Sequence, residues 1–123
     1  MERANVIKEE IVREENQFLA VYVEAKNSCL IMLSENEDRM GTLAIAVPKP
    51  TDVLGPVTSS ILVGDKNGIS ARTFAEYIAA KKGKIALVSI YLDKVSESQA
   101  HKYFSELIEK VFQKETKKQL VKL

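Results

Sequence analysis

The stretch Thr58-Ser59-Ser60-Ile61-Leu62-Val63-Gly64-Asp65-Lys66-Asn67-Gly68 begins a strand, turn, helix and strand unit that extends to Leu92. Its first six residues are β-branched, small or aliphatic and are typical of a strand. The five residues that follow combine glycine with Asn and Asp, which favours a turn. The unit predicts that this chain mixes strands and helices within one sheet-based domain.

A helix is predicted from Ala71 to Lys82. Ser70 is placed to cap its N-terminus, two lysines lie in its last turn, and Gly83 suits a left-handed C-terminal cap. The run Lys84–Leu92 is almost continuously apolar and has the length of a strand. It is therefore predicted to be a central strand that is buried on both faces.

Composition limits the class of protein. The chain has 123 residues, enough for one domain spanning 1–123, and its 18 basic and 17 acidic residues leave a net charge of +1. That balance disfavours a partner such as nucleic acid or an anionic membrane. The single cysteine, Cys29, lies in an apolar run and predicts a reduced, buried thiol. With no signal-like or membrane-spanning stretch in the sequence, a cytoplasmic location is expected.

The remaining segments add four strands and a second helix. A strand is assigned to Ala4–Glu14, although its spacing also fits a helix, and Gln17–Lys26 with Ser28–Ser34 predicts a hairpin. Met40–Val47 is expected to continue this meander as the fourth strand. Ser96 with Gln99 is a capping-box pattern that begins a long amphipathic helix. Residues 113–123 form a basic tail that is expected to fray.

The faces of the predicted sheet suggest self-association. The strands that begin at Gln17, Met40 and Lys84 carry apolar residues on both faces, whereas two helices can cover only one face. The sequence thus predicts an α+β fold with a five- or six-stranded, mainly antiparallel sheet, two helices on one face, and the other face used for self-association. The alternative is that the first segment or the proline-containing loop folds over that face.

Residues able to carry catalysis are sparse. His101 is the single histidine and is interpreted as a surface residue of the last helix, while Cys29 is interpreted as a core residue. No metal site or cofactor is implied, because one His and one Cys at distant positions do not complete a ligand set. Glu35, Glu37 and Asp38 are interpreted as a solvated loop. Gly64–Gly68 lacks the spacing of a phosphate-binding loop, and the lysine tail is interpreted as a solubilising end.

An ordered set of short motifs resembles a known family. Arg39-Met40-Gly41-Thr42-Leu43, a proline-containing connection, Thr58–Asp65, a helix with Phe74-Ala75, and the strand Ala86–Ile90 follow one another in the chain. Together they resemble the proteasome assembly chaperones of the third and fourth type, as an archaeal-type relative. The likeness extends from about residue 5 to 112. Its motifs are individually short, so the resemblance rests on their order along the chain and on the matching chain length.

The resemblance implies a non-enzymatic α+β chaperone that pairs through its sheet, as a homodimer or larger homo-oligomer. It would bind proteasome α subunits transiently while their ring assembles. The chain ends Val121-Lys122-Leu123 and lacks the penultimate tyrosine by which other proteasome-binding proteins dock. Contact with α subunits is therefore expected from the body of the domain, and the loops Glu35–Arg39 and Pro48–Pro56 are the candidates.

The fourth strand supplies the predicted self-association face, through Thr42, Leu43, Ile45 and Val47. Two other classes of protein remain open. The first is a dimeric α+β adapter that scaffolds a regulatory GTPase or a trafficking complex. The second is a small-molecule-binding or enzymatic domain, which the absence of a ligand-capable polar cluster in the sequence disfavours.

Overall fold

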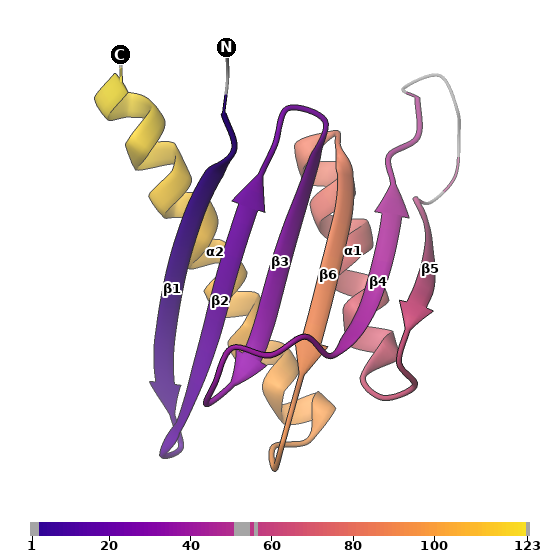
Figure 1. The fold of residues 1–123 in the computed structure, drawn as a ribbon, viewed down its shortest axis with the longest axis vertical. Helices are drawn as coiled ribbons and strands as arrows, with labels where there is room; N and C mark the ends of the chain where they lie inside the picture. The colour runs from indigo at the N-terminus through magenta and orange to yellow at the C-terminus, as the bar shows by residue number, and fades with distance from the viewer. Residues whose placement is uncertain (1–2, 51–54, 56, 123) are drawn as a thin grey trace.

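A computed structural model describes residues 3–50, 55 and 57–122, apart from the side chains of 119–122. Within these residues, six strands form one sheet and two helices pack against it (Figure 1). This confirms the α+β class and a six-stranded sheet. The elements are β1 (Asn5–Arg13), β2 (Asn16–Glu24), β3 (Ser28–Glu35), β4 (Thr42–Val47), β5 (Thr58–Val63), α1 (Gly68–Lys82), β6 (Ile85–Tyr91) and α2 (Glu97–Lys122).

The strand order is β1-β2-β3-β6-β4-β5. Strands β1, β2 and β3 form an antiparallel meander, but β4 does not continue it, so that prediction is wrong. Instead β6 lies between β3 and β4, parallel to β3 and antiparallel to β4. The reason is the composition of β6: a nearly continuous apolar strand gains most from a central position, with a strand on either side and a helix over one face.

Both helices lie on the same face of the sheet, as predicted (Figure 1). Helix α1 packs over β4, β5 and β6, and helix α2 packs over β1 and β2. Aromatic contacts join α2 to the sheet: the Phe18 ring centroid lies 5.0 Å from that of Tyr103 and 5.7 Å from that of Phe104. The hydrophobic core therefore lies between the sheet and this single layer of helices.

The N-terminus of α1 differs from the prediction. The helix begins at Gly68, and its N-cap is Asn67, which is in the left-handed conformation and makes no capping hydrogen bond with its side chain. Ser70 lies inside the first turn and not at the cap position. There its amide donates to Glu97 (2.7 Å) and its hydroxyl contacts His101 (2.8 Å), both on α2. Contacts with α2 thus replace the predicted local cap. The C-terminal cap at Gly83, with φ of 64°, is confirmed.

Helix α2 begins as predicted: the Gln99 amide donates to the Ser96 hydroxyl at 3.3 Å. It then continues as helix through Lys122, although residues from 113 onwards were expected to fray. Glu115 explains part of this difference, because its side chain is buried against α1 and β2. Neither helix, over the residues that the structure describes, combines the length and apolarity that a membrane span requires.

Candidate functional site

The face of the sheet that carries no helix has a continuous apolar strip. Strand pairing places Val23 beside Leu30, Leu30 beside Leu87, and Leu87 beside Ile45. Side chains that face each other across neighbouring strands point to the same face. All four are partly exposed, whereas the residues one position earlier on the same strands face the helices and are buried. Four strands thus contribute to one apolar row.

A second row runs beside the first. Val21 pairs with Met32, and Ser89 lies between Met32 and Leu43. Val6 on β1 and Val47 on β4 extend the surface at its two sides, with 51% and 50% of their areas exposed. We call this surface the open apolar face; it consists of Val6, Val21, Val23, Leu30, Met32, Leu43, Ile45, Val47 and Leu87.

Three of the four residues predicted for self-association, Leu43, Ile45 and Val47, lie on the open apolar face. Thr42 does not, and its assignment to that face is wrong. Successive side chains of a strand point to opposite faces, so Thr42 shares the helix-covered side with Ala44. It is only 5% exposed and is paired with Ile90.

A loop covers the lower end of the helix-free face. Residues 36–41 connect β3 to β4 and cross in front of β6 (Figure 1). The Gly41 amide donates to the Ser89 hydroxyl at 2.8 Å, and the Arg39 guanidinium lies 5.4 Å from the Tyr91 ring centroid. Ser34 and Ser89 are consequently fully buried on a face without helices. We call residues 36–41 the crossing loop; it leaves the open apolar face uncovered.

Glu35 was predicted to lie in a solvated loop, and this is wrong. It is the last residue of β3 and is fully buried. Its carboxylate accepts hydrogen bonds from the backbone amides of Asp93 (3.1 Å), Lys94 (3.2 Å) and Val95 (3.0 Å). Because β6 runs parallel to β3, Glu35 lies where the chain leaves β6 and turns toward α2. Glu35 therefore stabilises a connection, while Glu37 and Asp38 are exposed as predicted.

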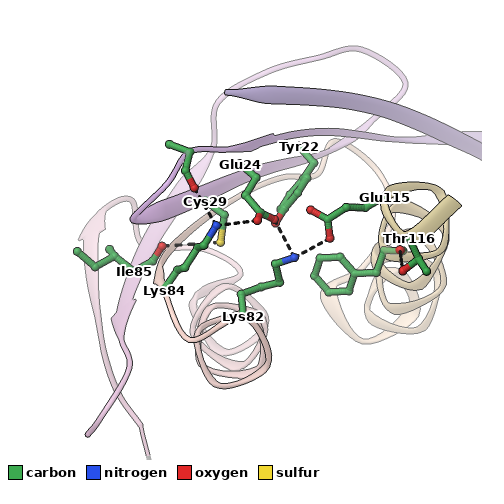
Figure 2. Close-up of polar contacts among 10 residues, drawn as sticks. Tyr22, Glu24, Cys29, Lys82, Lys84, Ile85, Glu115 and Thr116 are labelled. Carbon is green, nitrogen blue, oxygen red and sulfur yellow. Dashed lines mark hydrogen bonds and ion pairs between the residues drawn. The ribbon is translucent and has the colours of Figure 1, made fainter. Parts of the chain in front are cut away.

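A partly buried ion network joins the two helices to the sheet (Figure 2). The Lys82 Nζ atom lies 2.8 Å from Glu24 and 2.6 Å from Glu115, so the end of α1 is linked to β2 and α2. Lys84 contacts the other Glu24 oxygen at 2.7 Å, and the Tyr22 hydroxyl donates to Glu24 at 2.5 Å. Sequence reasoning missed this network, because its residues come from distant segments and form no motif.

The two carboxylates of the network differ in acidity. Burial alone would raise the pKa of Glu24, but the hydrogen bonds that it receives outweigh burial and hold the pKa well below its ordinary value. The pKa of Glu115 is raised, first by burial and then by the neighbouring Glu24. The pKa of Lys82 is raised despite burial, because both carboxylates stabilise its charge. Glu115 is therefore the first of the pair to take up a proton on acidification.

The two residues considered for nucleophilic chemistry lie apart and are engaged internally. Cys29 is buried, as predicted, and burial raises the pKa of its thiol, which disfavours the reactive thiolate. His101 is only partly exposed: its Nδ1 lies 2.8 Å from the Ser70 hydroxyl and its ring stacks on Phe74 at 4.5 Å. The prediction of a plain surface histidine missed these contacts. Across the described ranges, His, Cys, Asp and Glu form no group of three that could hold a metal ion.

Comparison with known proteins identifies the fold. No protein-family model matches the chain, and no curated protein matches its sequence. A chain of the solved structure described as "Crystal Structure of a Novel Chaperone Complex for Yeast 20S Proteasome Assembly" superposes with a TM-score of 0.66 at 13% sequence identity. The match covers 93% of this chain and 96% of that chain. The present chain therefore has the fold of a subunit of a yeast proteasome assembly chaperone complex over nearly its whole length.

Proposed function

We propose that this chain is a non-enzymatic chaperone that assists assembly of the proteasome α-subunit ring by transient protein binding. Two independent lines support the proposal. The fold matches that of a subunit of a yeast 20S proteasome assembly chaperone complex along 93% of the chain. The ordered motifs from Arg39 to Ile90 also resemble that family. On this proposal the chain acts in the cytoplasm and needs no cofactor.

The open apolar face is the observation that carries the proposal. It spans β1, β2, β3, β6 and β4, and the crossing loop leaves it uncovered. Contiguous apolar surfaces of this kind mark sites of protein association. We propose that a second copy covers this face, in a homodimer or a larger homo-oligomer. The polar clusters of the described residues do not suggest catalysis, because Glu24, Glu35 and His101 each serve contacts within the fold.

The client of the proposed chaperone, a proteasome α subunit, would then bind outside the paired faces. The crossing loop is one candidate, because Glu37, Asp38, Arg39 and Met40 are exposed on a loop that Gly41 anchors to β6. Glu35, which was included with this loop on sequence grounds, is buried and unavailable to a client. The second candidate, Pro48–Pro56, lies partly outside the described residues.

Size-exclusion chromatography with light scattering tests both parts of the proposal. The purified chain is run alone, then with isolated proteasome α subunits, and then with mature 20S particles as the control. An oligomer that co-elutes with α subunits but weakly or not at all with mature particles supports the chaperone function. An oligomer that binds neither contradicts it, and capture of a purified small GTPase would favour the adapter function. A monomer would overturn the role assigned to the open apolar face.

A further inference from the structure

Several segments that carry cationic residues meet at one end of the sheet, the upper end in Figure 1. The β2–β3 turn, the end of α1 and the start of β6 meet there, because β3 and β6 are parallel and Lys84 Nζ contacts the Ala25 carbonyl at 2.9 Å. The last turns of α2 join them through the pair of Glu115 with Lys82. We call this surface the basic end; its cations are Arg3, Lys26, Lys81, Lys84, Lys117 and Lys118.

The carboxylates of these segments do not neutralise the basic end toward solvent. In the described parts of the segments, the acidic residues are Glu24 and Glu115, whose side chains are 13% and 10% exposed. Both are engaged by Lys82, and Glu24 also by Lys84. In contrast, Lys26, Lys81, Lys117 and Lys118 are exposed. The solvent-facing charge of this end is therefore positive.

The opposite end of the molecule has the opposite character. The β1–β2 turn, the crossing loop and the β6–α2 connection meet there. Acidic residues are in excess among their exposed charges, which are Glu14, Glu15, Glu37, Asp38 and Asp93 against Arg39 and Lys94. The chain is thus nearly neutral as a whole, with a net charge of +1, yet its charges are separated along the strand direction. A separated distribution steers an oppositely charged partner toward one end.

Helix electrostatics explain only part of this separation. Both helices end at the basic end, and cations near a helix C-terminus are stabilising, which accounts for Lys81 and for the lysines of α2. Lys26 lies in a turn between strands, and Arg3 precedes β1, so neither has a helix terminus of its own to stabilise. Helix dipoles therefore do not explain the cations that the strands and their turn contribute to the basic end.

We propose that the basic end binds an acidic polypeptide segment, a surface or tail rich in Asp and Glu. The cations are mainly lysines, which act as compact point charges and suit dispersed carboxylates. Phosphate groups are less favoured, because both described helices begin at the opposite end, and this surface therefore offers no helix N-terminus of the kind that binds phosphate. Stacking of nucleic-acid bases has little support here, since Tyr22 and Phe112 at this end are buried. The exposed Tyr77 has Lys81 Nζ 5.7 Å from its ring centroid, and its hydroxyl donates to Glu109. This inference does not rest on the proposed chaperone function.

Fluorescence anisotropy with a labelled oligoglutamate peptide of about twelve residues tests the proposal at low and high salt. The double variant Lys26→Glu/Lys118→Glu is compared with Lys66→Glu/Lys94→Glu, which makes the same charge change with exposed lysines of the opposite end. We expect wild-type binding to weaken steeply with salt. The basic-end variant should lose at least about tenfold in affinity, and the control about twofold or less.

Circular dichroism verifies that both double variants remain folded, since all four lysines are exposed and their replacement removes no core contact. Three results would overturn the proposal. These are no binding of the peptide at low salt, an equal loss of affinity in both double variants, or tighter binding of an oligothymidylate of matched length through the same lysines. The last result would assign the basic end to phosphate groups.

Discussion

Gly41 lies so close to Ile90 that a Cβ atom on Gly41 would stand 2.0 Å from the Ile90 carbonyl oxygen. The contact occurs where the crossing loop passes over β6, and the atoms that would clash belong to the backbone of β6, which cannot move aside. Gly41 is the glycine of the Met-Gly-Thr-Leu motif that resembles the assembly chaperones. In this chain that motif glycine is required by the fold.

Replacing Gly41 by alanine should destabilise the protein by about 1–3 kcal/mol, because overpacking against an immobile backbone forces a local shift. Gly68→Ala is the matched control: its Cβ would meet Ile61 at an ordinary 3.6 Å, at the first position of α1. That substitution should be neutral or stabilising by up to about 1 kcal/mol. Urea unfolding measures both, and equal stability of the two variants would contradict the close crossing.

Ile45→Asp tests the open apolar face. Ile45 lies in the apolar row beside Leu87, so a second copy would have to bury the new charge without a partner. We expect the oligomer to dissociate into monomers or to aggregate, as measured by light scattering. Ile69→Asp is the control, because Ile69 is 78% exposed on α1 and its replacement should leave the oligomer intact. An intact oligomer of Ile45→Asp would exclude this face as the interface.

Glu35→Ala should destabilise the protein by about 2–4 kcal/mol, since three backbone amides between β6 and α2 would lose their acceptor. Glu37→Ala, two residues later, removes an exposed pair with Arg39 and should change the unfolding free energy by less than about 0.5 kcal/mol. The two values come from urea titrations under the same conditions. Similar small effects of both substitutions would mean that Glu35 does not stabilise the connection.

Acid stability should depend on Glu24. Its pKa is lower in the folded protein than in the unfolded chain, where the ordinary value is 4.5. The folded state therefore binds fewer protons, and the stabilisation that is fully present above pH 4.5 is lost as the pH falls. Glu115, whose pKa is raised, acts in the opposite sense and loses its contribution as the pH rises through that raised value.

We therefore expect the unfolding free energy of Glu24→Gln to fall less on acidification below about pH 4.5 than that of the wild type. At neutral pH the variant should be less stable by about 1–2 kcal/mol, because Lys82 and Lys84 lose a charged partner in a partly solvated site. Denaturant unfolding across a pH series measures both effects. Glu106→Gln, in an exposed pair with Arg13, is the matched control and should change the unfolding free energy at neutral pH by less than about 0.5 kcal/mol. Parallel profiles for wild type and Glu24→Gln would contradict the lowered pKa.

Much of the secondary structure follows from local sequence. The strand from Thr58, the left-handed cap at Gly83 and the Ser96 cap of α2 depend on residues close to one another in the chain. Apolar residues on both faces of β2 and β4 also indicate a sheet with one apolar face that two helices leave uncovered. These features were predictable because their physical causes lie within a few residues of each other.

The candidate site was predictable only in part. Alternation along β4 was sufficient to place Leu43, Ile45 and Val47 together, and it would also have excluded Thr42. The row that Ile45 forms with Leu87 could not be predicted, because it depends on β6 lying between β3 and β4. Several apolar strands compete for the same neighbours, and their order is decided by how the whole sheet and its helices bury apolar area.

The sequence by itself determined the class of fold, the ends of most elements and the apolar character of both sheet faces. Only the tertiary structure decided the strand order, the crossing loop over β6, the burial of Glu35 and the meeting of Glu24, Lys82 and Glu115. The physical reason is the separation in sequence between the residues that interact. Hydrogen-bonded turns, caps and periodicity act between near neighbours, whereas burial and ion pairing depend on segments that approach each other only when the chain is folded.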